Sequence, residues 1–340
     1  MATLKLNLAL SCCLFFVFPL VILTISNLVS ANPDKLFLFF FEAKSDGTVV
    51  RFFTPTLVPA SLDAATNVQS TDVVLNPDTK VSGRLYRPMN APSGTLHPLL
   101  IFFHGGGFST GSAFSVDIHT YMNTLSSLGN LAILSVDYRL APEHPVKDLY
   151  DDAYDGVLWV AKQAAGQGSS SEAWMKDVVN YDRIFVGGQS SGGNIAHNVG
   201  MRIQELKPAG VKLGGMIIIH SYFLTVDPLP SILKEPEDMR NNITELWSFV
   251  CPGTTGLDDP RVNPSLEPDL QIIKPAKVLI CAAELDAMKD ASKAYYDALK
   301  WSGVDTEFYL TQGKRHMFDN FDPKCPEAMA LHSKIVSYMQ

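Results

Sequence analysis

The sequence predicts an α/β protein with a mostly parallel central sheet and helices on both of its faces. Short apolar, β-rich segments alternate with helical patterns along most of the chain, an order that is typical of such folds. Six segments have the character of strands: residues 99–103, 132–136, 184–186, 216–219, 278–282 and 307–310. Two later segments repeat apolar residues at helical spacing: Ile195, Val199, Ile203 and Leu206, and then Ala328, Leu331, Ile335 and Met339.

The composition indicates one large folded domain behind a short leader. The chain has 340 residues, of which 46% are hydrophobic and 18% charged, so it can bury a sizeable core and is not disordered. The net charge of −8 and the lack of a densely basic segment argue against nucleic acid as a partner. The sequence also lacks the motifs that bind nucleotides, dinucleotides or zinc, and we therefore expect no cofactor and no metal.

Residues 1–31 have the character of a leader. No charged residue lies between Lys5 and Asp34, and the small residues Ser30 and Ala31 predict a signal peptide that is cleaved after Ala31. The alternative is an uncleaved signal anchor, because an apolar span of this length can cross a bilayer. We expect a secretory or extracellular location, with a membrane-anchored or cytoplasmic protein as the alternatives.

Two stretches fit the strand and helix alternation poorly, about 32–76 and about 222–270. Irregular segments of this kind supply caps over functional sites, so the sequence predicts that both cover a site on the domain at 32–340. Five apolar side chains in the second stretch could line an acyl pocket, and the alternative is that they belong to the ordinary core under a long connection. They are Tyr222, Phe223, Leu224, Trp247 and Phe249.

The residues 188–192, Gly-Gln-Ser-Ser-Gly, connect a predicted strand directly to a predicted helix. A serine on such a sharp turn needs a strained backbone, and neighbouring side chains would collide with the packed elements, which explains the glycines. This context predicts that Ser190 is a nucleophile. Ser191 is interpreted as the donor of a backbone N–H.

A second glycine-rich segment follows the predicted strand at 99–103, in the order His104-Gly105-Gly106-Gly107. Bare N–H groups at such a turn can receive the negative oxygen of a tetrahedral intermediate. We therefore expect Gly106 and Gly107, together with Ser191, to form an oxyanion hole; the alternative is a flexible glycine turn. His104 is expected to be a structural residue.

A serine hydroxyl needs a base and a carboxylate that orients the base. His316 lies in a loop between the last predicted strand and the last helix, which suits the base better than any of the other seven histidines. The strand at 278–282 is followed by Glu284 and Asp286, and either could be the acid; Asp286 is favoured. The order Ser190, Asp286, His316 matches the order of nucleophile, acid and base in α/β-hydrolases.

Several long motifs in the right order resemble the plant carboxylesterase family, a branch of the α/β-hydrolase fold that is similar to hormone-sensitive lipase and also contains the gibberellin receptors. The resemblance covers about residues 36 to 339. It is carried by the motifs at 104–108 (His-Gly-Gly-Gly-Phe), 136–145 (Val-Asp-Tyr-Arg-Leu-Ala-Pro-Glu-His-Pro), 188–194, 251–253 (Cys-Pro-Gly) and 258–260 (Asp-Asp-Pro). The resemblance implies the same triad and oxyanion hole, with the block at 137–145 as scaffold.

The sequence departs from this family at two places. Position 189 is usually acidic in relatives and is Gln189 here, which removes a negative charge next to the nucleophile. The leader is also atypical, because relatives usually begin close to the cap.

These observations predict a serine carboxylesterase that acts on a small-molecule ester without a metal or an organic cofactor. One alternative is a dehydratase or cyclase that uses the same pocket and base without an acyl enzyme. A less favoured one is a small-molecule receptor, since the receptors of similar fold lack the triad histidine that this chain retains. A membrane contact is expected only through an uncleaved leader, and the sequence does not indicate an oligomeric state.

Overall fold

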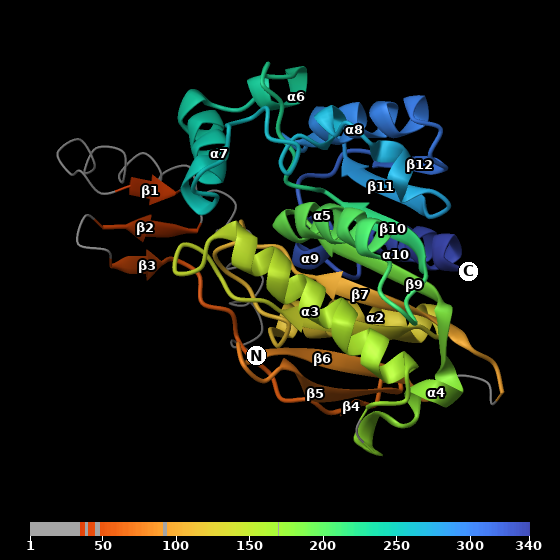
Figure 1. Cartoon of the computed structure of the whole chain (residues 1–340). Helices are drawn as coiled ribbons and strands as arrows, with labels where there is room; N and C mark the ends of the chain where they lie inside the picture. The colour runs from red at the N-terminus through yellow and green to blue at the C-terminus, as the bar shows by residue number, and fades with distance from the viewer. Residues whose placement is uncertain (1–34, 38–39, 45–47, 91–93, 169) are drawn as a thin grey trace, which may run out of the picture.

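The computed structural model describes residues 35–340 except 38–39, 45–47, 91–93 and 169. Within these residues the central sheet has nine strands in the order β12-β11-β10-β9-β7-β8-β6-β5-β4 (Figure 1). The six predicted strands are confirmed as β7 (His97–Phe103), β8 (Ala132–Asp137), β9 (Val179–Gln189), β10 (Leu213–Ile219), β11 (Lys277–Ala283) and β12 (Thr306–Thr311). These six pair in parallel with one another, as the α/β pattern predicts.

Helices cover both faces of the sheet, as the sequence predicts. The face that includes Leu99 and Ile101 of β7 packs on α3 (Val146–Ala164), α5 (Ser191–Leu206) and α8 (Lys289–Trp301). The opposite face, with Leu100 and Phe102, packs on α2 (Val116–Gly129) and α10 (Pro326–Met339). Successive residues of β7 thus enter two different cores, which explains why its sequence is apolar throughout. The two predicted amphipathic helices are α5 and α10.

The structure corrects the first predicted cap segment, residues 32–76. Its C-terminal part is sheet: β4 (Leu62–Asp63) pairs with β5 (Val68–Asn76), and β5 pairs with β6 (Val81–Pro88), which runs antiparallel to β8. The pattern of β5 hides this role, because Thr71 and Asp72 are both exposed and interrupt the alternation of buried and exposed residues.

The remaining part of that segment does lie against the second one. β1 (Lys35–Phe37), β2 (Phe41–Ala43) and β3 (Val49–Arg51) form a small antiparallel sheet that lies beside α7 (Glu237–Val250) in Figure 1. The ring of Phe249 on α7 lies 4.7 Å from the ring of Phe37 and 5.6 Å from that of Phe41. An aromatic contact therefore joins parts of the chain about 200 residues apart. The short helix α6 (Pro230–Leu233) precedes α7.

The predicted leader, residues 1–31, lies outside the described residues. Across the part of the chain that the structure describes, no helix combines the length and the apolar character that crossing a bilayer requires.

Candidate active site

The serine turn lies between β9 and α5, at the carboxyl edge of the parallel strands. Ser190 has φ of 54° and ψ of −121°, a combination that an L-residue adopts only under strain. A Cβ atom at Gly188 would lie 2.3 Å from the carbonyl oxygen of Gly192, and one at Gly192 would lie 2.0 Å from that of Phe103. Glycine is therefore required at both positions, for the steric reason that the motif suggests.

The hydroxyl of Ser190 is directed to a histidine and not to its own helix. Ser190 is the N-cap residue of α5, a position where a serine side chain usually accepts a hydrogen bond from the first helical turn. Its Oγ makes no such bond and instead lies 2.9 Å from Nε2 of His316. The start of α5, with its partial positive charge, thus lies next to the oxygen that would become negative.

The second nitrogen of His316 meets a carboxylate. Nδ1 of His316 lies 2.7 Å from Oδ2 of Asp286, and the backbone N–H of Met288 donates to Oδ1 of Asp286 at 2.9 Å. Asp286 is buried, with 3% of its surface exposed. With the Nδ1 proton held by Asp286, Nε2 of His316 can accept the proton of Ser190.

Glu284, the alternative acid, lies elsewhere. It is exposed, and its Oε2 accepts a hydrogen bond from the backbone N–H of Gly313 at 2.7 Å. The N–H of Leu285 donates to the carbonyl of Lys314 at 2.9 Å. These bonds join the loop after β11 to the loop after β12, so Glu284 helps to bring His316 over Asp286 without contacting it.

The charges of this pair shift each other's pKa. Burial by itself raises the pKa of Asp286, but the charge of His316 and its hydrogen bond outweigh burial, and the net pKa is lowered. Burial lowers the pKa of His316, but the charge of Asp286, its hydrogen bond and the charge of Asp319 outweigh it, and the net pKa is raised. The site therefore favours an ionised Asp286 and a basic His316.

This shift predicts a particular pH dependence. His316 can accept a proton only while it is neutral, so kcat/KM should fall as the pH decreases through its pKa. Because that pKa is raised, we expect the acidic limb at a higher pH than an unperturbed histidine would give. The measurement is the pH profile of kcat/KM for a p-nitrophenyl ester, whose release is corrected for the ionisation of p-nitrophenol. A limb at or below the usual histidine value would contradict the raised pKa.

The glycine loop is held so that two of its N–H groups have defined directions. Nδ1 of His104 lies 2.8 Å from the carbonyl oxygen of Gly105. The backbone N–H groups of Ser109 and Thr110 donate to the carbonyl of Gly106 at 3.1 and 3.0 Å. In a trans peptide the C=O and the following N–H point in opposite directions, so these bonds orient the N–H groups of Gly106 and Gly107.

The third expected donor is oriented in the same way. The N–H of Tyr222 donates to the carbonyl of Ser190 at 2.9 Å, which directs the N–H of Ser191 to the opposite side of that peptide. Gly106 and Gly107 have φ of 124° and 57°, values that favour glycine. The ring of Phe40 lies over this loop: a Cβ atom added to Gly107 would lie only 2.7 Å from Cζ of Phe40.

The block at 137–145 lies behind the glycine loop. Oδ1 of Asp137 accepts hydrogen bonds from the hydroxyl of Ser112 at 2.7 Å and the N–H of Ala113 at 2.9 Å. The hydroxyl of Tyr138 donates to the carbonyl of His104 at 2.6 Å, and the two rings stack with centroids 4.3 Å apart. His104 and this block thus support the loop, as their interpretation as scaffold suggests.

A polar cluster that the sequence reasoning missed lies beneath the serine turn. Asp319, in the short helix α9 (Phe318–Phe321), is fully buried, and its Oδ2 accepts a hydrogen bond from Nε2 of Gln189 at 2.8 Å. Nδ1 of the buried His220 lies 3.5 Å from Oδ1 of Asp319. A carboxylate therefore lies next to position 189 although Gln189 itself is neutral. The available signal was the position of Asp319 three residues after His316.

Other histidines have structural surroundings. Nδ1 of His197 lies 2.8 Å from the hydroxyl of Tyr295, and burial lowers the pKa of His197 to about 3. His119 lies 3.2 Å from the hydroxyl of Tyr86, and His144 lies 3.5 Å from Asp148. None of these three contacts the Ser190 hydroxyl.

A hollow of about 230 Å³ lies beside the segment that follows Asp286. Met288, α7 and the start of α8 line it, together with Phe223 and Leu224 from the segment after β10. Two of the five side chains proposed for an acyl pocket thus line a hollow. Tyr222 and Trp247 are buried in the core, and Phe249 packs on the small sheet.

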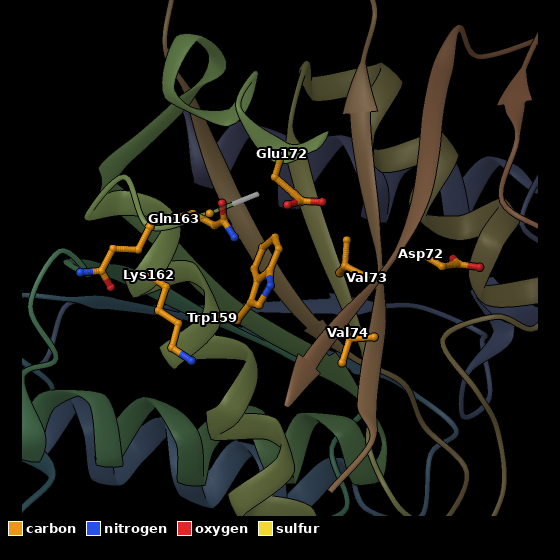
Figure 2. A pocket seen from close by; sticks show the side chains of 9 residues that line it. Asp72, Val73, Val74, Trp159, Lys162, Gln163 and Glu172 are labelled. Atoms are coloured by element: carbon orange, nitrogen blue, oxygen red, sulfur yellow. The ribbon is translucent and has the colours of Figure 1, made fainter. Parts of the chain in front are cut away.

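A second hollow of about 310 Å³ lies between β5 and the C-terminal half of α3 (Figure 2). Figure 2 shows the indole ring of Trp159 near its middle, with Val73 and Val74 of β5 beside it. No residue of the triad or of the glycine loop lines this hollow, so it is separate from the candidate active site.

The amino-acid sequence is similar to a known family of proteins. A family model for the alpha/beta hydrolase fold matches residues 100–320. The chain is 35% identical over 292 residues to "Probable carboxylesterase 2" of Arabidopsis thaliana, which covers 84% of this chain and 90% of that protein. It is 35% identical over 312 residues to "Tuliposide A-converting enzyme 1, chloroplastic" of Tulipa gesneriana, with coverage of 90% and 77%.

Two further similar proteins have names that indicate different activities, a dehydratase and an esterase. The chain is 32% identical over 325 residues to "2-hydroxyisoflavanone dehydratase" of Glycyrrhiza echinata, which covers 92% of this chain and 98% of that protein. Among solved structures, an esterase of Pyrobaculum calidifontis superimposes with a TM-score of 0.65 at 27% identity and covers 80% of this chain and 84% of that chain.

Proposed function

This chain belongs to the plant carboxylesterase family of α/β hydrolases, and on that premise we propose that it is a serine carboxylesterase that hydrolyses small carboxylic esters. The observation that carries the proposal is the unbroken line of contacts from Asp286 through His316 to the hydroxyl of Ser190, at 2.7 and 2.9 Å. Both distances are within the range of hydrogen bonds that transfer protons.

In the first half of the reaction, Oγ of Ser190 attacks the ester carbonyl while Nε2 of His316 takes the hydroxyl proton. Asp286 stabilises the imidazolium that forms and keeps its ring in place. The N–H groups of Gly106, Gly107 and Ser191 receive the negative oxygen of the tetrahedral intermediate. The C–O bond to the alcohol then breaks, and His316 returns the proton to the leaving oxygen.

In the second half, water attacks the acyl-serine ester. His316 takes a proton from the water, the tetrahedral intermediate forms on the same donors, and its collapse releases the carboxylic acid with Ser190 reprotonated. The cycle uses no metal and no organic cofactor, since each step moves only protons and acyl groups.

The experiment that tests this proposal uses protein without residues 1–31 and two readouts. We expect hydrolysis of p-nitrophenyl acetate and butyrate, and stoichiometric labelling of Ser190 by a serine-directed organophosphate. Mass spectrometry of the labelled peptide identifies the modified residue. If folded protein neither turns over these esters nor takes up the label, the esterase proposal is wrong.

A second candidate is a dehydratase or cyclase that uses the same base without an acyl enzyme. The observation that favours it is the similarity to the Glycyrrhiza echinata dehydratase over nearly the whole length of both chains. In that case His316 would still remove a proton, but no ester bond to Ser190 would form. Rapid quenching during turnover separates the two proposals, because only an esterase accumulates an acylated serine peptide.

We propose that the leader directs the protein to the secretory pathway. The basis is the apolar stretch before Asp34 with small residues at 30 and 31, while the tulip relative is named as a chloroplastic enzyme. Expression in plant cells should give secreted protein whose N-terminal sequence begins at Asn32. Import into plastids, or secreted material that begins at Met1, would contradict this prediction.

A further inference from the structure

The buried cluster beneath the serine turn contains a carboxylate that the proposed mechanism does not use. Asp319 and His220 are 0% and 1% exposed, so neither reaches bulk solvent. Asp319 accepts a hydrogen bond from Gln189 and lies 3.5 Å from His220, and within the described part of the chain no lysine or arginine forms an ion pair with it. An isolated buried carboxylate is costly to a fold unless a positive charge interacts with it.

A positive charge does form nearby during the proposed reaction. His220 connects Asp319 with His316. Its Nδ1 lies 3.5 Å from Oδ1 of Asp319, and the centre of its ring lies 6.2 Å from the centre of the His316 ring. The charge of Asp319 is one of the causes that raise the pKa of His316, and charges interact more strongly in the low-dielectric interior than in water. The imidazolium of His316 is the cation that forms when Ser190 loses its proton.

Three groups face His316 from separate elements. Asp286 comes from the loop after β11, His220 directly follows β10, and Asp319 lies in α9. Burial lowers the pKa of His220, which keeps it neutral and removes it as a competing cation. On the loop of His316 itself, Lys314 forms an ion pair with Glu327 at 3.0 Å.

The same carboxylate also contacts the serine turn. Its partner Gln189 is fully buried and immediately precedes Ser190, so the hydrogen bond between Gln189 and Asp319 ties the nucleophile's backbone to the helix that follows the base. Tyr121 and His332 also lie near Asp319: burial raises the pKa of Tyr121 and lowers that of His332, and the charge of Asp319 raises both. The surroundings of Asp319 are thus polar but uncharged.

We propose that Asp319 is a positioning residue that stabilises the protonated His316 and holds the serine turn through Gln189. Asp286 orients His316 by direct contact, whereas Asp319 acts from beneath, across His220. The assignment rests on the proposed esterase function, since it concerns the base of that reaction.

The first test is Asp319→Asn, which keeps the shape and removes the charge. We expect kcat/KM for p-nitrophenyl acetate to fall about tenfold with KM little changed. The pKa of the acidic limb should fall by about one unit, because one pKa unit and a tenfold change in rate correspond to the same free energy. Asp322→Asn is the matched control: it removes the same charge from an exposed residue three positions later, and we expect wild-type kinetics. An unshifted acidic limb in Asp319→Asn would overturn the proposal even if the activity fell.

The second test moves the charge instead of deleting it. In the double variant Gln189→Glu/Asp319→Asn, the amide at 319 can donate to the carboxylate at 189, so the hydrogen bond is reversed and one negative charge stays in the cluster. We expect the acidic limb to return to within a few tenths of a unit of the wild-type value. If Asp319→Asn does not fold, this variant decides alone, and a limb shifted to low pH would overturn the proposal.

A third readout separates this proposal from the esterase proposal. The pKa of His316 can be followed by NMR of ¹⁵N-labelled imidazoles in the free protein, without any substrate. If wild-type protein lacks esterase activity, the function is wrong but the influence of Asp319 on His316 is still measured. If wild-type protein is active and the His316 pKa is the same in Asp319→Asn, only the positioning role is wrong.

Discussion

Ser190→Ala is expected to lower kcat/KM for p-nitrophenyl acetate by roughly 10⁶-fold, the scale of losses seen when a catalytic serine is removed. The substitution deletes the hydroxyl oxygen that lies 2.9 Å from Nε2 of His316. Alanine supplies no nucleophile, so the covalent route is lost, and the residual rate comes from the oxyanion hole and substrate binding alone. Organophosphate labelling should disappear as well.

The strained backbone at Ser190 makes a control for folding necessary, because alanine must adopt the same φ of 54°. Thermal unfolding and the near-ultraviolet circular dichroism spectrum should match wild type within small limits. Ser333→Ala, which removes a hydroxyl from an exposed position of α10, is the matched control and should keep full activity. Retained turnover in a folded Ser190→Ala protein would exclude the acyl-enzyme mechanism.

Asp286→Asn has the second largest expected effect, a loss of about 10⁴-fold in kcat. The amide can donate to Nδ1 of His316, which favours the tautomer whose Nε2 carries a proton and cannot take one from Ser190. The contribution that raises the pKa of His316 is also lost, so the acidic limb of the pH profile should move to lower pH. Steady-state kinetics across the pH range in which the variant is folded measure both effects.

The matched control for this variant is Glu284→Gln, the acid that the sequence left open. Glu284 accepts a bond from the N–H of Gly313 at the surface, and glutamine can still accept it through its carbonyl oxygen. We therefore expect a change of less than about threefold in kcat, in line with exposed hydrogen bonds of modest energy. The opposite ranking, with Glu284→Gln inactive and Asp286→Asn active, would assign the acid to Glu284.

Much of the fold could be predicted because its parallel strands are apolar on both faces. Residues 99–103 of β7 face two cores in turn, and such a segment is conspicuous in any sequence. The strands β5 and β6 were not predicted, because β5 lies near the edge of the sheet and carries exposed polar residues at 71 and 72. Their assignment depends on pairing with β8, a contact that no local pattern reports.

Much of the candidate site could be proposed from the sequence for a similar reason: Ser190, Gly106 and Gly107 lie in short segments whose glycines are needed for backbone geometry. His316 and Asp286 could be named as candidates because each follows a strand. Asp319 was not named, because its position three residues after His316 is a weak signal and a single aspartate at the start of a short helix resembles a solvent-exposed residue. Its burial against Gln189 arises from contact between segments 130 residues apart.

The sequence alone determined which residue types could carry the chemistry, since a strained turn, bare peptide groups and a base each demand particular side chains. The tertiary structure alone decided which of them meet. Ser190 and His316 are 126 positions apart, and they come within 2.9 Å because β9, β10, β11 and β12 lie side by side in parallel and end at one edge. Packing between distant segments also sets the direction of each side chain. It places Asp286 and not Glu284 against His316, and it buries Asp319 against Gln189.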